Sequence, residues 1–176
     1  MNVFDLLEKD HEAAKRLLAR LEATTERATK TREEGFAQLR TALDMHARLE
    51  ERFFYPELKE AAATRDMTLE ALEEHRIVKR LLSEIDGTAT DSDEWSAKLK
   101  VLKDNVEHHI EEEEGALFPK ARKVLGAEEA DRIGTEMEAA RESLIVLAVS
   151  AVSDTAERLV ERAGRVIEKA RSLLSG

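Results

Sequence analysis

Apolar side chains recur along most of the chain at alternating steps of three and four residues. This spacing places side chains on one buried face of an α-helix. Four such stretches are predicted as helices, at residues 3 to about 27, 36–55, 69–86 and 94–118. Proline lacks a backbone N–H, so the second helix should kink or end at Pro56 and the fourth should end at Pro119. A connector to about Thr68 and a loop from Gly87 to Asp93 are expected to separate the helices.

Six polar residues occupy positions on these faces where leucine would be expected. They are His11, His46, Glu50, His75, His109 and Glu113, and the same faces are expected to bury Phe53 and Ala116. His46 and Glu50 are four residues apart, and the pair recurs 63 residues later as His109 and Glu113. Residues i and i+4 lie on one side of a helix, one turn apart. Each pair therefore presents an imidazole beside a carboxylate.

The segments around His11 and His75 also match each other, at an offset of 64 residues. The chain thus contains two copies of one helical hairpin, which predicts a pseudo-twofold axis. We predict an all-α fold, an up-down-up-down four-helix bundle over residues 1–125, with one or two extra C-terminal helices in residues 126–176. The apolar run Leu144 to Val152 and the seam Leu159, Ala163, Val166, Ala170 and Leu173 would pack on the bundle or form a homodimer interface.

Composition narrows the functional classes. The formal net charge of −10 repels nucleic acid and anionic lipid, so neither is expected as a partner. The chain has no cysteine, so a metal would have to be held by imidazole, carboxylate or phenolate. No segment reads as a signal peptide and no apolar run is long enough to span a bilayer, so a cytoplasmic protein is expected.

One histidine on a buried helix face would be interpreted most simply as a hydrogen-bonded core residue. Four imidazoles and two carboxylates without partners would cost several kcal/mol per charged group, whereas divalent cations would satisfy all six. The set is too large for one tetrahedral zinc ion and suits two octahedral ions. We predict two iron ions, Fe²⁺ or Fe³⁺ with an oxo or hydroxo bridge, and zinc or manganese as alternatives.

These motifs resemble those of the hemerythrin-like, or HHE cation-binding, family. The resemblance covers residues 3 to about 125 and rests on Asp10-His11-Glu12, His46-x-x-x-Glu50 with Tyr55-Pro56, Glu74-His75, and His109-x-x-x-Glu113 with Phe118-Pro119. It implies a bundle around a non-haem di-iron centre with the same six residues as ligands. Oxygen-carrying hemerythrins have a fifth histidine on the third helix, one turn from the first, but Ala71 and Lys79 stand at those positions. They also pair the last histidine with an acid five residues on, which makes Glu114 an alternative to Glu113.

Water, Tyr55, Glu74 or His108 could replace the missing imidazole. A phenolate suits ferric iron, but the repeat has Phe118 at the position of Tyr55, and His108 is expected to face solvent. Fewer imidazoles leave more exchangeable positions on the irons, which favours reaction with dioxygen, peroxide or nitric oxide over oxygen carriage. The expected function is peroxidase-like, catalase-like or NO-handling. The alternatives are an iron or oxygen sensor, an iron-holding protein without turnover, and a metal-free helical interaction module.

Overall fold

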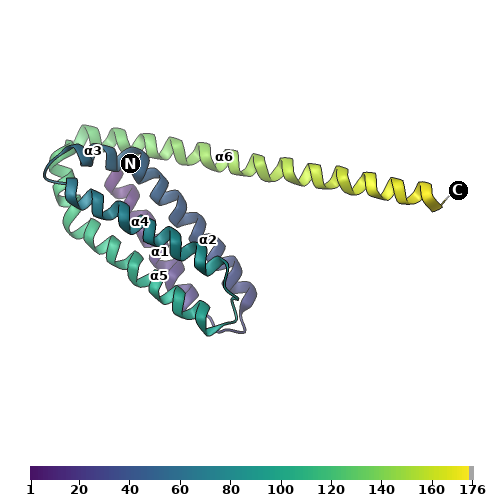
Figure 1. The fold of residues 1–176 in the computed structure, drawn as a ribbon. Coiled ribbons are helices and arrows are strands. Elements are labelled where there is room, and N and C mark those ends of the chain that lie inside the picture. The colour runs from purple at the N-terminus through teal and green to yellow at the C-terminus, as the bar shows by residue number, and fades with distance from the viewer. Residues whose placement is uncertain (175–176) are drawn as a thin grey trace. The chain divides into compact units, whose positions relative to one another are not determined.

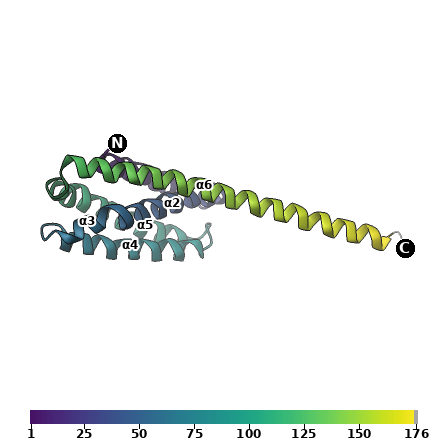
Figure 2. The same ribbon diagram turned by 90° about the horizontal axis from the view of Figure 1, so that it is seen from above.

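The computed structural model describes residues 1–174, with side chains except those of 148 and 151–174. This part of the chain is formed by helices joined by short loops and contains no strand. Its elements are α1 Val3–Glu22, α2 Thr29–Leu49, the π-helix η1 Glu50–Phe54, α3 Tyr55–Glu60, α4 Arg65–Asp86, α5 Asp93–Glu112, the π-helix η2 Glu113–Leu117, and α6 Phe118–Leu174. Helices α1, α2, α4 and α5 lie side by side, with contacts between α1 and α2, α2 and α4, α4 and α5, and α5 and α1 (Figures 1 and 2). The predicted all-α bundle is confirmed.

The starts of α1 and α5 are fixed by capping side chains. The side chain of Asn2 accepts a hydrogen bond from the backbone N–H of Asp5, and that of Ser92 accepts one from Trp95, so both caps satisfy a free helical donor. The buried Arg32 donates to the carbonyl of Thr90 at 2.6 Å and lies 4.7 Å from the ring centre of Trp95. Arg32 thereby connects α2 to the loop between α4 and α5.

Both prolines lie within helical segments. The backbone N–H of Tyr55 donates to the carbonyl of Glu50, and that of Phe118 donates to Glu113, so each helix contains a turn with i to i+5 bonding. Pro56 and Pro119 follow these turns directly. The widened turn already interrupts the regular i to i+4 ladder, so a residue without an N–H is tolerated there. The predicted connector to Thr68 is wrong, because α3 continues to Glu60 and α4 begins at Arg65.

The π-helical turns also change which side chains are buried. Each turn adds one residue, which rotates the following side chains by about 100° relative to a regular helix. Phe54 is consequently fully buried while Phe53 is only half-buried, and Leu117 is buried while Ala116 is exposed. The predicted burial of Phe53 and Ala116 is wrong for this reason.

The chain groups into two compact units, Met1–Met137 and Glu138–Gly176. Within α6, Gly126 has a φ of 72°, a left-handed conformation that favours glycine and interrupts the helix. The second unit is helical to Leu174, and its apolar side chains Ile145, Val146, Leu147 and Val149 are exposed. The expected seam from Leu159 to Leu173 lies outside the described side chains, so its use in a homodimer stays a prediction. Within the described helices, none has the length and apolar character needed to cross a bilayer.

Gly134 lies where α6 passes the N-terminal residues. A Cβ at this position would lie 2.2 Å from the carbonyl oxygen of Met1 and 2.8 Å from the nitrogen of Val3. We expect Gly134→Ala to lower the free energy of unfolding by about 1–3 kcal/mol, because backbone atoms must move to admit the methyl group. The measurement is urea denaturation. Gly115→Ala is the control, since nothing lies within 4 Å of its Cβ; equal urea midpoints for the two variants would contradict the prediction.

Candidate metal centre

Six buried polar side chains meet inside the bundle. They are His11 of α1, His46 of α2, His75 of α4, His109 of α5, and the first residues of the two π-helices, Glu50 and Glu113. None is more than 7% exposed. These are the six residues that the spacing analysis singled out, and we call them the inner group.

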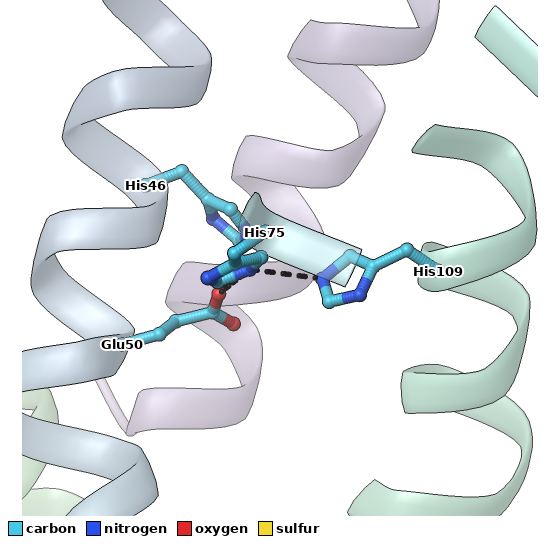
Figure 3. Close-up of side chains that lie close together, drawn as sticks. All are labelled: His46, Glu50, His75 and His109. Carbon is cyan, nitrogen blue, oxygen red and sulfur yellow. Dashed lines mark hydrogen bonds and ion pairs between the residues drawn. The ribbon is translucent and has the colours of Figure 1, made fainter. Parts of the chain in front are cut away.

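Glu50 lies between two of the histidines. Its Oε2 atom is 3.0 Å from Nε2 of His46 and 3.3 Å from Nε2 of His75, and the latter nitrogen is 3.3 Å from Nε2 of His109 (Figure 3). Potential ligand atoms of these four residues all lie within 4.8 Å of one another. One carboxylate and three imidazoles therefore surround a common point.

Glu113 occupies the matching place in the second repeat. Its Oε2 atom is 3.3 Å from Nε2 of His11 and 3.5 Å from Nε2 of His109. A second group of four potential ligands, also within 4.8 Å of one another, consists of His11, His46, Glu50 and Glu113. The two groups overlap, and in both the histidine Nε2 atoms turn inward.

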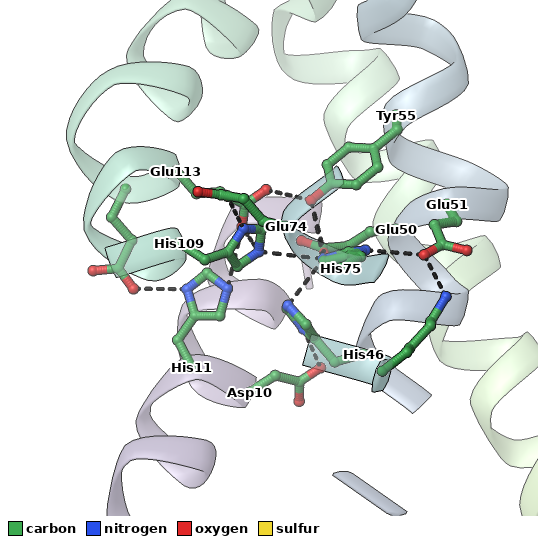
Figure 4. A network of polar contacts seen from close by, with 12 residues as sticks. Asp10, His11, His46, Glu50, Glu51, Tyr55, Glu74, His75, His109 and Glu113 are labelled. Carbon is green, nitrogen blue, oxygen red and sulfur yellow. Dashed lines mark hydrogen bonds and ion pairs between the residues drawn. The ribbon is translucent and has the colours of Figure 1, made fainter. Parts of the chain in front are cut away.

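A carboxylate faces the outer nitrogen, Nδ1, of every histidine in the inner group (Figure 4). The pairs are His11 with Glu114 at 2.8 Å, His109 with Glu74 at 2.7 Å, His75 with Glu51 at 3.0 Å, and His46 with Asp10 at 3.7 Å. A carboxylate that accepts a hydrogen bond from Nδ1–H leaves the Nε2 lone pair free, which is how histidines that bind metals are oriented. We call these four acids the outer carboxylates.

The outer carboxylates follow the repeat. Asp10 and Glu74 precede the first histidine of each hairpin, and Glu51 and Glu114 follow the inner glutamate. Lys79 stands at one of the two positions expected for the missing fifth histidine. Its Nζ atom lies 2.7 Å from Oε1 of Glu51. The hydrogen bonds of Glu51 with His75 and Lys79 lower its pKa to about 2, so Glu51 is ionised at neutral pH.

The residues considered as additional ligands take other places. Glu74 and Glu114 are outer carboxylates and contact Nδ1 atoms, whereas the side chain of His108 is 63% exposed. The buried hydroxyl of Tyr55 donates to Oε1 of Glu113 at 2.8 Å and also lies 3.3 Å from Oε2 of Glu50. Burial raises the pKa of Tyr55 and the two carboxylates raise it further, so the phenol keeps its proton.

The sequence did not lead us to expect that Asp10 and Glu51 face the Nδ1 atoms of histidines. The internal repeat nevertheless contained a sign of this contact. An acid precedes the first histidine of each hairpin and another acid follows each inner glutamate. Positions that keep the same charge in both copies are candidates for contact with the repeated histidines.

Several buried atoms of the inner group have no hydrogen-bond partner. They are Nε2 of His11, both ring nitrogens of His46, Oε1 of Glu50 and Oε2 of Glu113. Nε2 of His11 and Nε2 of His46 nevertheless lie at ion-pair distance, 3.3 and 3.0 Å, from a carboxylate oxygen of the inner group. A buried polar atom without a partner costs about 1–3 kcal/mol, and more when it is charged. A cation among these atoms would satisfy them, and nitrogen and oxygen ligands without sulfur suit iron, manganese or zinc. The residues present therefore fit a metal.

Metal binding is expected to release protons. Burial lowers the pKa of His46, but Glu50 and Asp10 outweigh it and raise this pKa to about 10. In the same way Glu50 and Glu51 overcome the effect of burial on His75 and raise its pKa to about 9. Both imidazoles are therefore protonated at neutral pH before metal binds, and each must lose a proton to offer a lone pair.

Metal affinity should accordingly rise as the pH increases from 6 toward 9. Calorimetric titration with Zn²⁺ in buffers of different ionisation enthalpy counts the released protons. Apparent binding enthalpies that do not depend on the buffer would contradict this prediction.

Comparison with known proteins agrees with the geometry. The family model described as the hemerythrin HHE cation binding domain matches residues 2–121. The crystal structure of a hemerythrin HHE cation binding domain-containing protein from Mycobacterium kansasii is similar, with a TM-score of 0.75 and 26% identity over 85% of this chain and 91% of that chain. A protein named DNA nickase from Nostoc sp. is 29% identical over 144 residues, which are 82% of this chain but 40% of that protein. The chain belongs to the hemerythrin HHE cation-binding family.

Proposed function

We propose that the inner group holds a non-haem di-iron centre that reacts with a small oxidant: dioxygen, peroxide or nitric oxide. The observation that carries this proposal is the convergence of four Nε2 atoms and two buried carboxylates, several of whose atoms lack a partner. The outer carboxylates support it, because three of them make hydrogen bonds with histidine Nδ1 atoms, which orients those imidazoles for metal binding, and Asp10 lies 3.7 Å from Nδ1 of the fourth, His46.

Two ions are favoured over one by the number and symmetry of the ligands. Each hairpin supplies two histidines and one glutamate, and the two groups of four potential ligands overlap rather than coincide. Glu50 and Glu113, one from each hairpin, would each offer carboxylate oxygens to a pair of ions held between the hairpins. When bound, iron would supply the redox step that none of these side chains can perform.

The surroundings of the centre favour a small reaction partner. Phe4, Phe54 and Phe118 pack against one another with ring centres 5.4–5.9 Å apart, and all three are buried. The ring of His11 stacks on Phe118 at 5.9 Å. This apolar cluster excludes water from one side of the centre and leaves no room there for a bulky organic substrate.

Tyr55 supplies a proton donor next to the centre. Its hydroxyl contacts both inner carboxylates, and its raised pKa keeps it protonated. We expect this O–H group to hold Glu50 and Glu113 in place. It could also donate a hydrogen bond to an oxygen species that reaches the centre.

Hydrogen peroxide consumption by iron-loaded protein tests the proposal. We expect repeated turnover by the iron-loaded chain and none by the same chain loaded with zinc, which cannot change its oxidation state. The zinc form is the matched control because both ions suit the same ligands. If the iron-loaded chain turns over neither peroxide, nor dioxygen, nor nitric oxide, the proposed reactivity is contradicted and an iron-holding or sensing role is favoured.

Action on DNA is not part of this proposal, although one relative is named a DNA nickase. The shared region covers 40% of that protein. Nucleic-acid binding relies on clustered positive charge, and this chain has a formal net charge of −10.

A further inference from the structure

A second group of metal-binding side chain types lies on the surface beside the buried centre. It consists of Glu74 of α4 with His108 and Glu112 of α5, and we call it the surface triad. Nε2 of His108 is 3.3 Å from Oε1 of Glu112 and 3.9 Å from Oε1 of Glu74. The three potential ligand atoms lie within 4.8 Å of one another. His108 and Glu112 also have the i, i+4 spacing of the histidine and glutamate pairs in the inner group.

Glu74 joins the surface triad to the centre. One of its oxygens, Oε1, faces His108, while the other, Oε2, lies 2.7 Å from Nδ1 of His109. A single carboxylate thus contacts both the exposed imidazole and a buried one.

A cavity continues from the triad toward the centre. Its volume is about 100 Å³, and Glu74, Glu112 and Glu113 are among the residues that line it. Glu113 is only 1% exposed, and its Oε2 atom has no hydrogen-bond partner. A cavity of this size exceeds the roughly 10–15 Å³ that one water requires, so a cation with part of its water shell would fit. The cavity is therefore lined both by two carboxylates of the surface triad and by Glu113 of the inner group.

The surface triad breaks the symmetry of the repeat. At the offsets that relate the two hairpins, the residues equivalent to Glu74, His108 and Glu112 are Asp10, Met45 and Leu49. Leu49 is 1% exposed and belongs to the core. The first hairpin thus has two apolar side chains where the second has an imidazole and a carboxylate. The triad therefore occurs in the second hairpin only, and the repeat that builds the inner group does not account for it.

We propose that Glu74, His108 and Glu112 form a surface site for a divalent cation, and that metal ions pass from it through the adjoining cavity to the buried centre at Glu113. The proposal rests on the proposed function in one respect, that the inner group takes up metal. Glu70 also lines the cavity, so four carboxylates, those of Glu70, Glu74, Glu112 and Glu113, raise the local concentration of cations along the route.

The rate of metal uptake tests the route. Metal-free protein is mixed with Co²⁺, and the visible absorption of the bound ion is followed by stopped flow. We expect Glu112→Gln and His108→Ala to fill the buried centre with Co²⁺ about tenfold more slowly at low ionic strength, with unchanged final cobalt in that centre. Glu111→Gln is the matched control, because it removes the same charge from the neighbouring exposed position and should keep the original rate.

The outcomes separate this proposal from the proposed function. Full uptake at the original rate in both triad variants would overturn the surface route and leave the buried centre intact. A chain that takes up no cobalt at all would contradict both. In protein whose centre is already filled with zinc, Mn²⁺ should broaden the imidazole proton resonances of His108; unbroadened resonances would overturn the surface site.

Discussion

Glu50→Gln and Glu113→Gln variants are expected to bind iron at least about 100-fold more weakly than the unchanged chain. Replacing only an outer partner of a metal ligand commonly costs 10–100-fold in affinity, so loss of an inner carboxylate should cost more. Oε2 of Glu50 lies within 3.3 Å of two histidine nitrogens, and Oε2 of Glu113 lies within 3.5 Å of two others. Glutamine keeps the shape of the side chain but removes the negative charge at the point where the imidazoles converge.

The measurement is iron per chain after equilibration with a competing chelator. Glu111→Gln is the control, since this exposed side chain lies outside both the inner group and the surface triad and the change should leave the equilibrium iron content unchanged. Equal loss of iron in all three variants would mean that the inner group is not the metal centre.

Metal binding is expected to raise the melting temperature by roughly 5–10 °C. A ligand that binds only the folded chain stabilises it by about 2.7 kcal/mol at 100 times its dissociation constant, and 1 kcal/mol shifts the melting temperature of a domain of this size by about 2–4 °C. This stabilisation would come from the inner group itself. Buried nitrogen and oxygen atoms of His11, His46, Glu50 and Glu113 that lack partners in the protein would gain a cation as partner.

Thermal unfolding followed by circular dichroism, with and without zinc, measures this shift. The Glu50→Gln variant is the control, because its melting temperature should respond weakly to the same zinc concentration. If the unchanged chain melts at the same temperature with and without zinc, metal binding to the buried atoms of the inner group is contradicted.

The helical repeat made most of the bundle predictable. Apolar residues at steps of three and four indicated the four long helices, and the repeated pair of histidine and glutamate indicated which polar residues face inward. This worked for His46 and Glu50 because a regular helix, α2, leads up to the glutamate, so helical spacing holds between them. All six residues singled out in this way lie in the inner group.

The spacing argument failed directly after each inner glutamate. A π-helical turn has no clear signature in the pattern of apolar residues, and its added residue changes which of the following side chains are buried. Phe54 is therefore buried where burial of Phe53 was expected, and Leu117 is buried where burial of Ala116 was expected. The sequence predicts a kink or an end at Pro56 and a helix end at Pro119, whereas in the structure both prolines lie within helical segments after these turns.

The outer carboxylates show a second limit of sequence reasoning. Glu74 and Glu114 were considered as metal ligands because their types and positions allowed it. Which ring nitrogen a carboxylate faces depends on how the helices are rotated about their axes. The apolar pattern shows which face of a helix is buried, but it does not fix the rotation closely enough to assign individual hydrogen bonds. The structure brings both acids to Nδ1 atoms.

Metal content combined with an absorption spectrum tests the central claim most directly. We expect purified chain loaded with iron in air to contain about two iron ions and to show the near-ultraviolet absorption of paired ferric ions, as four imidazoles and two carboxylates suit two octahedral ions. The His46→Ala variant should lose both the iron and the band. One iron ion per chain, or a spectrum without this band at full iron content, would contradict a di-iron centre.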